Sequence, residues 1–356
     1  MKKLISLVLT LVLALTLGAC GIDNNNGEDM NIETPDVSTD VTENDGAEAD
    51  TGNQDITAQE ESVNIAGLKG PTSMGLVKLL SDSEEGLTIN KYNVTKAGNA
   101  DEIAPRLIKG ELDMAAVPAN LASVLYNNTN GGVKILAVNT LGVVYIVEKG
   151  GEVAQLSDLV GKTVYATGKG QTPEYTLRYI LEENGIDPDN DLTIEFKSEP
   201  TEVVAILNNS EKGVAMLPQP YVTVAGNTVE GLTTVVDLNA EWEALGTESM
   251  LVTGVIVARS EFVENNPNTV KAFLEEYKKS VEFATENVDE AASLIEKYGI
   301  VKAPIAKKAL PFCNIRYIDG QQMKQAVSGY LTVLGGQNIK AVGGALPDDN
   351  FYYIAE

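Results

Sequence analysis

The sequence predicts an α/β protein with mostly parallel strands, and three observations support this fold class. Short β-forming runs alternate with helical runs from Val63 onward, an alternation typical of βαβ units. A second block of the same kind begins near Leu156 and extends over about 100 residues. The 356 residues are enough for about two domains and a sizeable hydrophobic core.

The first block begins with a short apolar strand at residues 63–66, followed by a turn at 67–70. Pro71 follows a glycine, and proline is favoured in the first turn of a helix. We expect this helix to extend to about Leu80. The other elements predicted in this block are a helix at 101–109, a strand at 113–117, a helix at 120–126, and strands at 134–139 and 143–148.

The second block opens at residues 156–164, and the Gly-Lys-Gly turn at 168–170 leads into a helix at 173–184. Gly185 suits the C-terminal cap of that helix. The next predicted elements are a strand at 192–197, a helix at 202–208, strands at 214–217 and 233–238, and a strongly β-forming run at 251–258. Everything after Asn266 is predicted to be helical, at 267–286, 289–298, 304–309 and 321–334.

The first 20 residues have the pattern of an export signal. Lys2 and Lys3 precede an apolar stretch at 4–17, which is shorter than the ~20 residues that a membrane-spanning helix needs. The following Leu-Gly-Ala-Cys sequence resembles the lipobox of bacterial lipoproteins, in which the cysteine carries the lipid. We therefore expect the chain to be exported and anchored through Cys20 on the periplasmic side, or cell surface, of the cytoplasmic membrane. An ordinary secretory signal with an incidental cysteine is the alternative.

Residues 21–62 contain 13 Asp and Glu residues, no Lys or Arg, and no aromatic residue. Such a segment cannot bury enough apolar surface to offset the entropy lost on ordering. The sequence therefore predicts a disordered acidic tether between the anchor and the folded part.

Composition excludes several classes of function. The net charge of −25 disfavours binding to nucleic acid. The chain contains no histidine, which rules out Ser-His-Asp triads, Cys-His pairs and the usual zinc or copper sites. We therefore expect no catalytic residues, no metal and no cofactor. Cys313 is expected to be a small buried residue without chemistry, and Trp242 a packing residue on a helix.

Three phrases resemble the type II periplasmic-binding-protein superfamily, in its nitrate/sulfonate/taurine class, which also includes binders of thiamine-pyrimidine precursors. The phrases are residues 107–118 (LIKGELDMAAVP), 156–162 (LSDLVGK), and 252–257 followed by 264–267 (VTGVIV and ENNP). The resemblance implies two α/β lobes with a ligand cleft between them and two crossing hinge segments. Lobe one would comprise 63–147 plus 255–356, and lobe two 148–254 with the hinges, which lie near 144–150 and 250–255.

In open α/β sheets, ligands bind beyond the carboxyl ends of strands, near helix N-termini. Applied to this chain, the rule selects candidate residues at strand ends and in the turns that follow them. The candidates are Thr72, Ser73, Pro118, Asn120, Thr140, Gly170, Gln171, Thr172, Gln219, Tyr221 and Thr253. Structural roles remain open: Thr72, Ser73 and Asn120 can instead cap helices, and the turns at 168–173 and 217–221 can be purely structural. No arginine is among the candidates, so a neutral or zwitterionic heteroaromatic ligand suits them as well as an anion does.

The resemblance implies a monomeric, lipid-anchored receptor that delivers a small polar organic solute to an ABC permease and its ATPase. One alternative is a ligand sensor or surface-interaction protein without a role in transport. Another is an enzyme on the same fold that processes a precursor, against which the export signal and the absent histidines argue.

Overall fold

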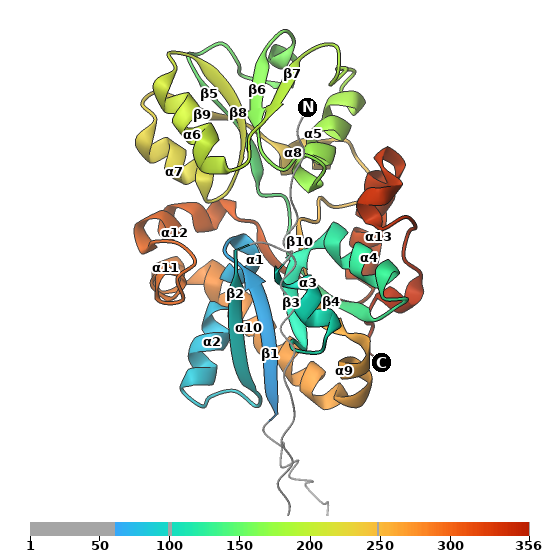
Figure 1. Ribbon diagram of the computed structural model, residues 1–356. Helices are drawn as coiled ribbons and strands as arrows, with labels where there is room; N and C mark the ends of the chain where they lie inside the picture. Colours follow the sequence, from blue (N-terminus) through green and yellow to red (C-terminus); the bar gives the residue numbers. More distant parts are fainter. Residues whose placement is uncertain (1–60, 99–101, 248, 356) are drawn as a thin grey trace, which may run out of the picture. The chain divides into compact units, whose positions relative to one another are not determined.

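Two mixed β-sheets organise the part of the chain that the structure describes (Figure 1). The structure is a computed structural model that describes residues 61–98, 102–247 and 249–355. The predicted export signal, Cys20 and all but the last two residues of the predicted tether lie outside these ranges.

The first sheet has six strands in the order β11-β4-β10-β3-β1-β2. Their bounds are β1 Ser62–Leu68, β2 Lys91–Ala97, β3 Met114–Pro118, β4 Val133–Thr140, β10 Gly254–Arg259 and β11 Ile315–Ile318. The second sheet has five strands in the order β7-β6-β8-β5-β9. Their bounds are β5 Val144–Lys149, β6 Thr163–Ala166, β7 Thr193–Phe196, β8 Gly213–Pro218 and β9 Leu232–Asp237.

The chain passes between the sheets in two crossing segments, at residues 141–143 before β5 and at residues 249–253 before β10. The two strands that follow these segments correct the prediction of mostly parallel pairing. β5 runs antiparallel to β8 and β9, and β10 runs antiparallel to β3 and β4. The start of β5 at Val144 lies opposite the end of β8 at Pro218, and the start of β10 at Gly254 lies opposite Pro118 and Thr140. Both strands thus enter a sheet at the edge where their neighbours end, which forces the opposite direction.

The helices flank the two sheets (Figure 1). Those that precede or follow strands of the first sheet are α1 Pro71–Met74, α2 Val77–Glu84, α3 Ala104–Ile108, α4 Ala119–Asn128, α9 Ser260–Asn265, α10 Pro267–Glu286, α11 Val288–Lys297, α12 Ala303–Ala309 and α13 Gly320–Gln337. Those of the second sheet are α5 Thr172–Glu183, α6 Pro200–Asn209, α7 Tyr221–Thr228 and α8 Leu238–Ala244. None of the described helices is long and apolar enough to cross a membrane.

Two predicted helical stretches differ from the structure. The helix expected to reach Leu80 is broken after α1, because Ser280 of α10 enters the break. Its hydroxyl donates to the Gly75 carbonyl at 2.7 Å and accepts the Leu79 N–H at 2.9 Å. The expectation that everything after Asn266 is helical is wrong at β11, where Ile315 pairs with Thr140 at the edge of the first sheet.

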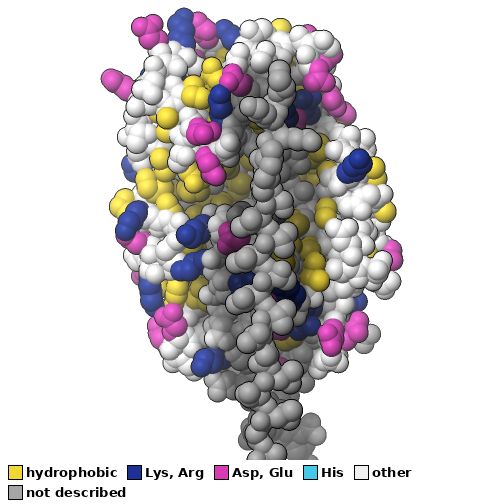
Figure 2. Space-filling view, viewed as in Figure 1, with side chains coloured by type: hydrophobic (Ala, Val, Ile, Leu, Met, Phe, Trp, Pro, Cys, Tyr) yellow, Lys and Arg dark blue, Asp and Glu magenta, His cyan; other side chains and the backbone are white. Residues whose placement is uncertain are grey.

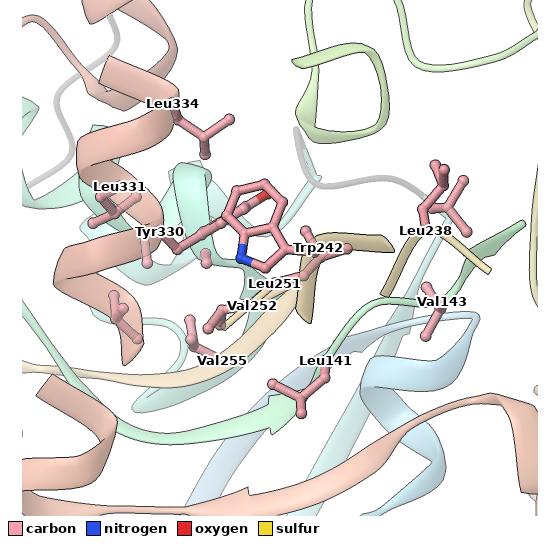
Figure 3. Packing of buried hydrophobic residues seen from close by; sticks show 14 of the residues in the cluster. Leu141, Val143, Leu238, Trp242, Leu251, Val252, Val255, Tyr330, Leu331 and Leu334 are labelled. Atoms are coloured by element: carbon pink, nitrogen blue, oxygen red, sulfur yellow. The ribbon is translucent and has the colours of Figure 1, made fainter. Parts of the chain in front are cut away.

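One buried hydrophobic cluster extends from the first sheet through both crossing segments into the second sheet. Figure 3 shows its central part, where Trp242 of α8 lies beside Tyr330 of α13 and near Leu251. The Trp242 and Tyr330 ring centroids are 5.6 Å apart, and both side chains are almost fully buried. The prediction that Trp242 is a packing residue is confirmed. This shared core joins α13 to the helices of the second sheet on one side of the crossing.

Candidate functional site

The carboxyl ends of strands from both sheets meet around a cavity of about 480 Å³. Five of the candidate residues line it together: Pro118, Asn120, Gln171, Thr172 and Thr253. The remaining lining residues are Leu68, Gly98, Leu121, Val144 and Pro173. All ten residues are uncharged, and they come from both sheets and from the second crossing segment. Five of the residues that the strand-end rule selected therefore lie around one cavity.

A hydrogen bond crosses the cavity wall between the two sheets. The Thr172 hydroxyl, in the first turn of α5, donates to the Asn120 Oδ1 in the first turn of α4 at 3.1 Å. Asn120 does not cap its own helix, because Pro118 occupies the N-cap position of α4 and no side chain caps that end. Asn120 thus lines the cavity and bridges α4 and α5.

The N-terminus of α5 already holds a carboxylate of the chain itself. The Gly170 N–H donates to Glu174 Oε2 at 2.6 Å, and Arg178 Nε donates to Glu174 Oε1 at 2.9 Å. Glu174 is only 9% exposed. Its negative charge occupies the end of α5 where the helix dipole would otherwise attract an anion. Gly170 itself forms the turn with φ +71° and is not part of the cavity lining.

Thr253 holds the second crossing segment against the first sheet. Its N–H donates to the Thr140 carbonyl at 3.0 Å, and its own carbonyl accepts the Ala119 N–H at 3.2 Å. This second bond ties the start of α4 to the crossing segment. The Thr253 side chain is half-buried and lines the cavity.

Three other candidates are buried and do not line the cavity. Thr72, Ser73 and Thr140 are buried, with exposed fractions of 8%, 4% and 0%. The Ser73 hydroxyl donates to the Leu68 carbonyl at 2.6 Å, and the Thr72 carbonyl accepts from the Asn139 amide at 3.1 Å. These contacts shape the end of the first sheet, and no side chain caps α1.

Gln219 and Tyr221 lie apart from the other candidates. Gln219 is 4% exposed and its Oε1 accepts the Thr223 hydroxyl at 2.9 Å. It lines a different cavity, bounded by α7 and β9. Tyr221 begins α7 and packs, half-buried, against the hydrophobic cluster of the second sheet. The described lining of the first cavity therefore contains no aromatic side chain.

Comparison with known proteins agrees with this architecture. The NMT1/THI5-like family model matches residues 132–291. A structure described as an ABC transporter from Parabacteroides distasonis is 24% identical, with a TM-score of 0.70, covering 83% of this chain and 99% of that one. The periplasmic aliphatic sulphonate binding protein from Escherichia coli is 15% identical, with a TM-score of 0.65 and coverages of 84% and 94%. The chain has the fold of the periplasmic binding proteins of ABC transporters. No curated protein sequence matches it.

The predicted resemblance and the predicted α/β class are thus confirmed, although the strands are not mostly parallel. Another similar structure is the ligand-binding component of an ABC-type import system from Staphylococcus aureus with zinc bound, 17% identical, with a TM-score of 0.63 and coverages of 83% and 97%. Within the described part of this chain, no group of three or more His, Cys, Asp and Glu side chains is placed to hold a metal ion.

Sequence reasoning missed the apolar half of the cavity. Leu68 was predicted to lie in a turn, Leu121 in a helix and Val144 in a strand, yet all three line the cavity. Their position at or close to the end of a strand or helix was the available signal, because a ligand pocket combines a mostly apolar lining with a few polar groups.

Proposed function

We propose that this protein is the substrate-binding component of an ABC importer, which captures a small, uncharged polar solute and delivers it to a permease and ATPase. The observation that carries the proposal is the cavity at the strand ends of both sheets. Its polar groups come from Asn120, Gln171, Thr172 and Thr253, and its walls from aliphatic residues and prolines.

The lining favours an uncharged solute over an anion. Several proteins of this fold are named for sulphonate or nitrate binding. No described residue that lines this cavity is Lys or Arg, whereas recognition of anions commonly uses the guanidinium group. The carboxylate of Glu174 also occupies the start of α5. Amide and hydroxyl groups suit the donors and acceptors of a neutral molecule, such as a pyrimidine-like ring or another vitamin precursor.

The proposal also includes export and anchoring through a lipid on Cys20. Its support is the sequence alone: two lysines, an apolar stretch of signal-peptide length, and small residues before the cysteine. Replacing Cys20 with serine should release the protein from washed membranes, since the lipid is the proposed anchor and docking on the permease is transient. Retention of the Cys20→Ser protein in washed membranes would contradict lipid anchoring without affecting the solute-binding role.

A ligand screen by thermal shift tests the central claim, with the full-length chain in a non-ionic detergent. The panel contains alkyl sulfonates, nitrate, amino acids, purines, pyrimidines and vitamin precursors. A ligand at ~100 times its dissociation constant adds about 2.7 kcal/mol to the free energy of unfolding. A neutral ligand that stabilises the parent, but not an Asn120→Ala variant, supports the proposal. Stabilisation by sulfonates or nitrate alone would refute the claim of an uncharged solute.

A further inference from the structure

A second cavity, of about 600 Å³, lies between α7 and β9 of the second sheet and the segment that includes α12. Figure 1 shows α7 and α12 facing each other at the left, and the two helices are in contact. On the face shown in Figure 2, hydrophobic side chains gather at the left, at the height that α7 and α12 have in Figure 1. The lining residues are Tyr145, Gln219, Val222, Thr223, Gly226, Asn227, Thr234, Val235, Val236, Asp237, Lys308 and Phe312.

Side-chain alternation along β5 separates this cavity from the first one. Successive side chains of a strand point to opposite faces of its sheet. Val144 lines the first cavity and belongs to the large cluster shared by both sheets. Tyr145 lines the second cavity and belongs to the separate cluster that contains Val222. The two cavities therefore lie on opposite faces of β5, and none of the described residues lines both.

Two polar contacts close the second cavity on the α12 side. The Tyr145 hydroxyl donates to the Phe312 carbonyl at 2.8 Å, and the Lys308 ammonium donates to Asn227 Oδ1 at 2.7 Å. The Phe312 side chain is 53% exposed although it borders the cavity. The walls are thus made by both halves of the fold.

Asp237 is the acidic group of this cavity. Its carboxylate caps α8 by accepting the N–H groups of Asn239 at 2.9 Å and Ala240 at 3.4 Å. Burial raises the pKa of the carboxyl, although these two backbone bonds act in the opposite direction. No Lys or Arg among the described residues forms an ion pair with it. A partly buried carboxylate without an ion-pair partner, in a cavity that Val222 also lines, suits a ligand that has an ammonium group on an apolar body.

We propose that this second cavity binds a small branched aliphatic ammonium compound, with the ammonium group on Asp237 and the aliphatic part against Val222 and Phe312. Gln219 supplies a further polar contact through its side-chain amide. The site is separate from the solute cavity and does not depend on the function proposed for it.

The probe is 3-methylbutylamine, titrated calorimetrically into the full-length chain in non-ionic detergent. Its uncharged counterpart, 3-methylbutan-1-ol, has the same apolar body. We expect the amine to bind at least tenfold more tightly than the alcohol. Equal affinities of the amine and the alcohol, or no measurable binding of the amine, would overturn the proposal.

Two variants place the site. Asp237→Asn removes the charge and keeps the cap of α8, since Asn and Asp cap helices about equally well. This variant should bind the amine no more tightly than the alcohol. Gly226→Leu fills the cavity from α7, where no neighbouring atom lies within 4 Å of the position that a Cβ would take, and it should weaken binding at least tenfold without unfolding the protein. If both variants, with parental unfolding midpoints, bind the amine like the parent, the site lies elsewhere and the proposal is wrong.

Discussion

Gly254 has no room for a side chain, and this makes a sharp prediction for Gly254→Ala. A Cβ at this position would lie 2.4 Å from Asn139 Oδ1 and 2.6 Å from Thr72 Cγ2. Asn139 is 1% exposed, and its amide nitrogen is held by the Thr72 carbonyl at 3.1 Å. The amide therefore cannot move aside without losing a buried hydrogen bond.

The expected loss of stability is about 2 kcal/mol. Overpacking in a core costs about 1–3 kcal/mol, and a disturbed hydrogen bond adds about 0.5–1.5 kcal/mol. The reduced entropy of the unfolded chain returns about 0.4–1 kcal/mol when alanine replaces glycine. Gly226→Ala is the matched control, because α7 leaves its Cβ free of neighbours. It should be neutral or stabilise the protein by up to about 1 kcal/mol, as alanine favours helix.

Urea unfolding followed by the fluorescence of Trp242, the only tryptophan, measures both variants. The midpoint of Gly254→Ala should fall at an unchanged slope, which indicates a change of stability and not of the unfolded state. A midpoint equal to that of the parent, or an equal loss in Gly226→Ala, would refute the steric argument.

Three further predictions concern single side chains. Thr172→Val, which removes the hydroxyl from the first cavity, should weaken binding of the solute found in the screen about tenfold. Thr172→Ser, which keeps a hydroxyl, should bind it like the parent. Equal affinities of Thr172→Val and the parent would exclude this hydroxyl from the site. The ammonium groups of Lys162 and Lys212 hold the pKa of the Glu152 carboxyl at about 2, below its ordinary 4.5. The ionised Glu152 therefore stabilises the fold fully above about pH 4.5, and this contribution is lost as the pH falls towards 2. The unfolding midpoints of the parent and of Glu152→Gln should differ at neutral pH and converge in acid. A difference that stays constant with pH would contradict this prediction. Burial raises the pKa of the Cys313 thiol to about 12. In a variant whose other cysteine is replaced by serine, Ellman's reagent should therefore react with Cys313 only after unfolding. Rapid reaction of the folded protein would show that the surroundings of Cys313 open to solvent.

Much of the fold was predictable because local signals agree with it. Proline in the first turn marks the start of α10, and the helix predicted at 267–286 has these bounds in the structure. The missed strand β11 has four residues, too few for periodicity to distinguish a strand from a turn. The direction of β5 and β10 was also missed, since it depends on the sheet edge at which each strand enters. That edge is a property of the assembled chain.

The candidate site could be predicted only in part, and the geometry of strands explains why. Strand ends share one edge of a sheet, so sequence reasoning grouped Asn120, Thr172 and Gln219 as neighbours. The side chains at those ends nevertheless point to either face, and the face is fixed only when the register is known. Val144 and Tyr145 are adjacent in the chain, yet they line different cavities. The strand-end rule therefore locates an edge that carries two cavities. The uncharged lining of one and the carboxylate of Asp237 in the other favour ligands of different chemistry.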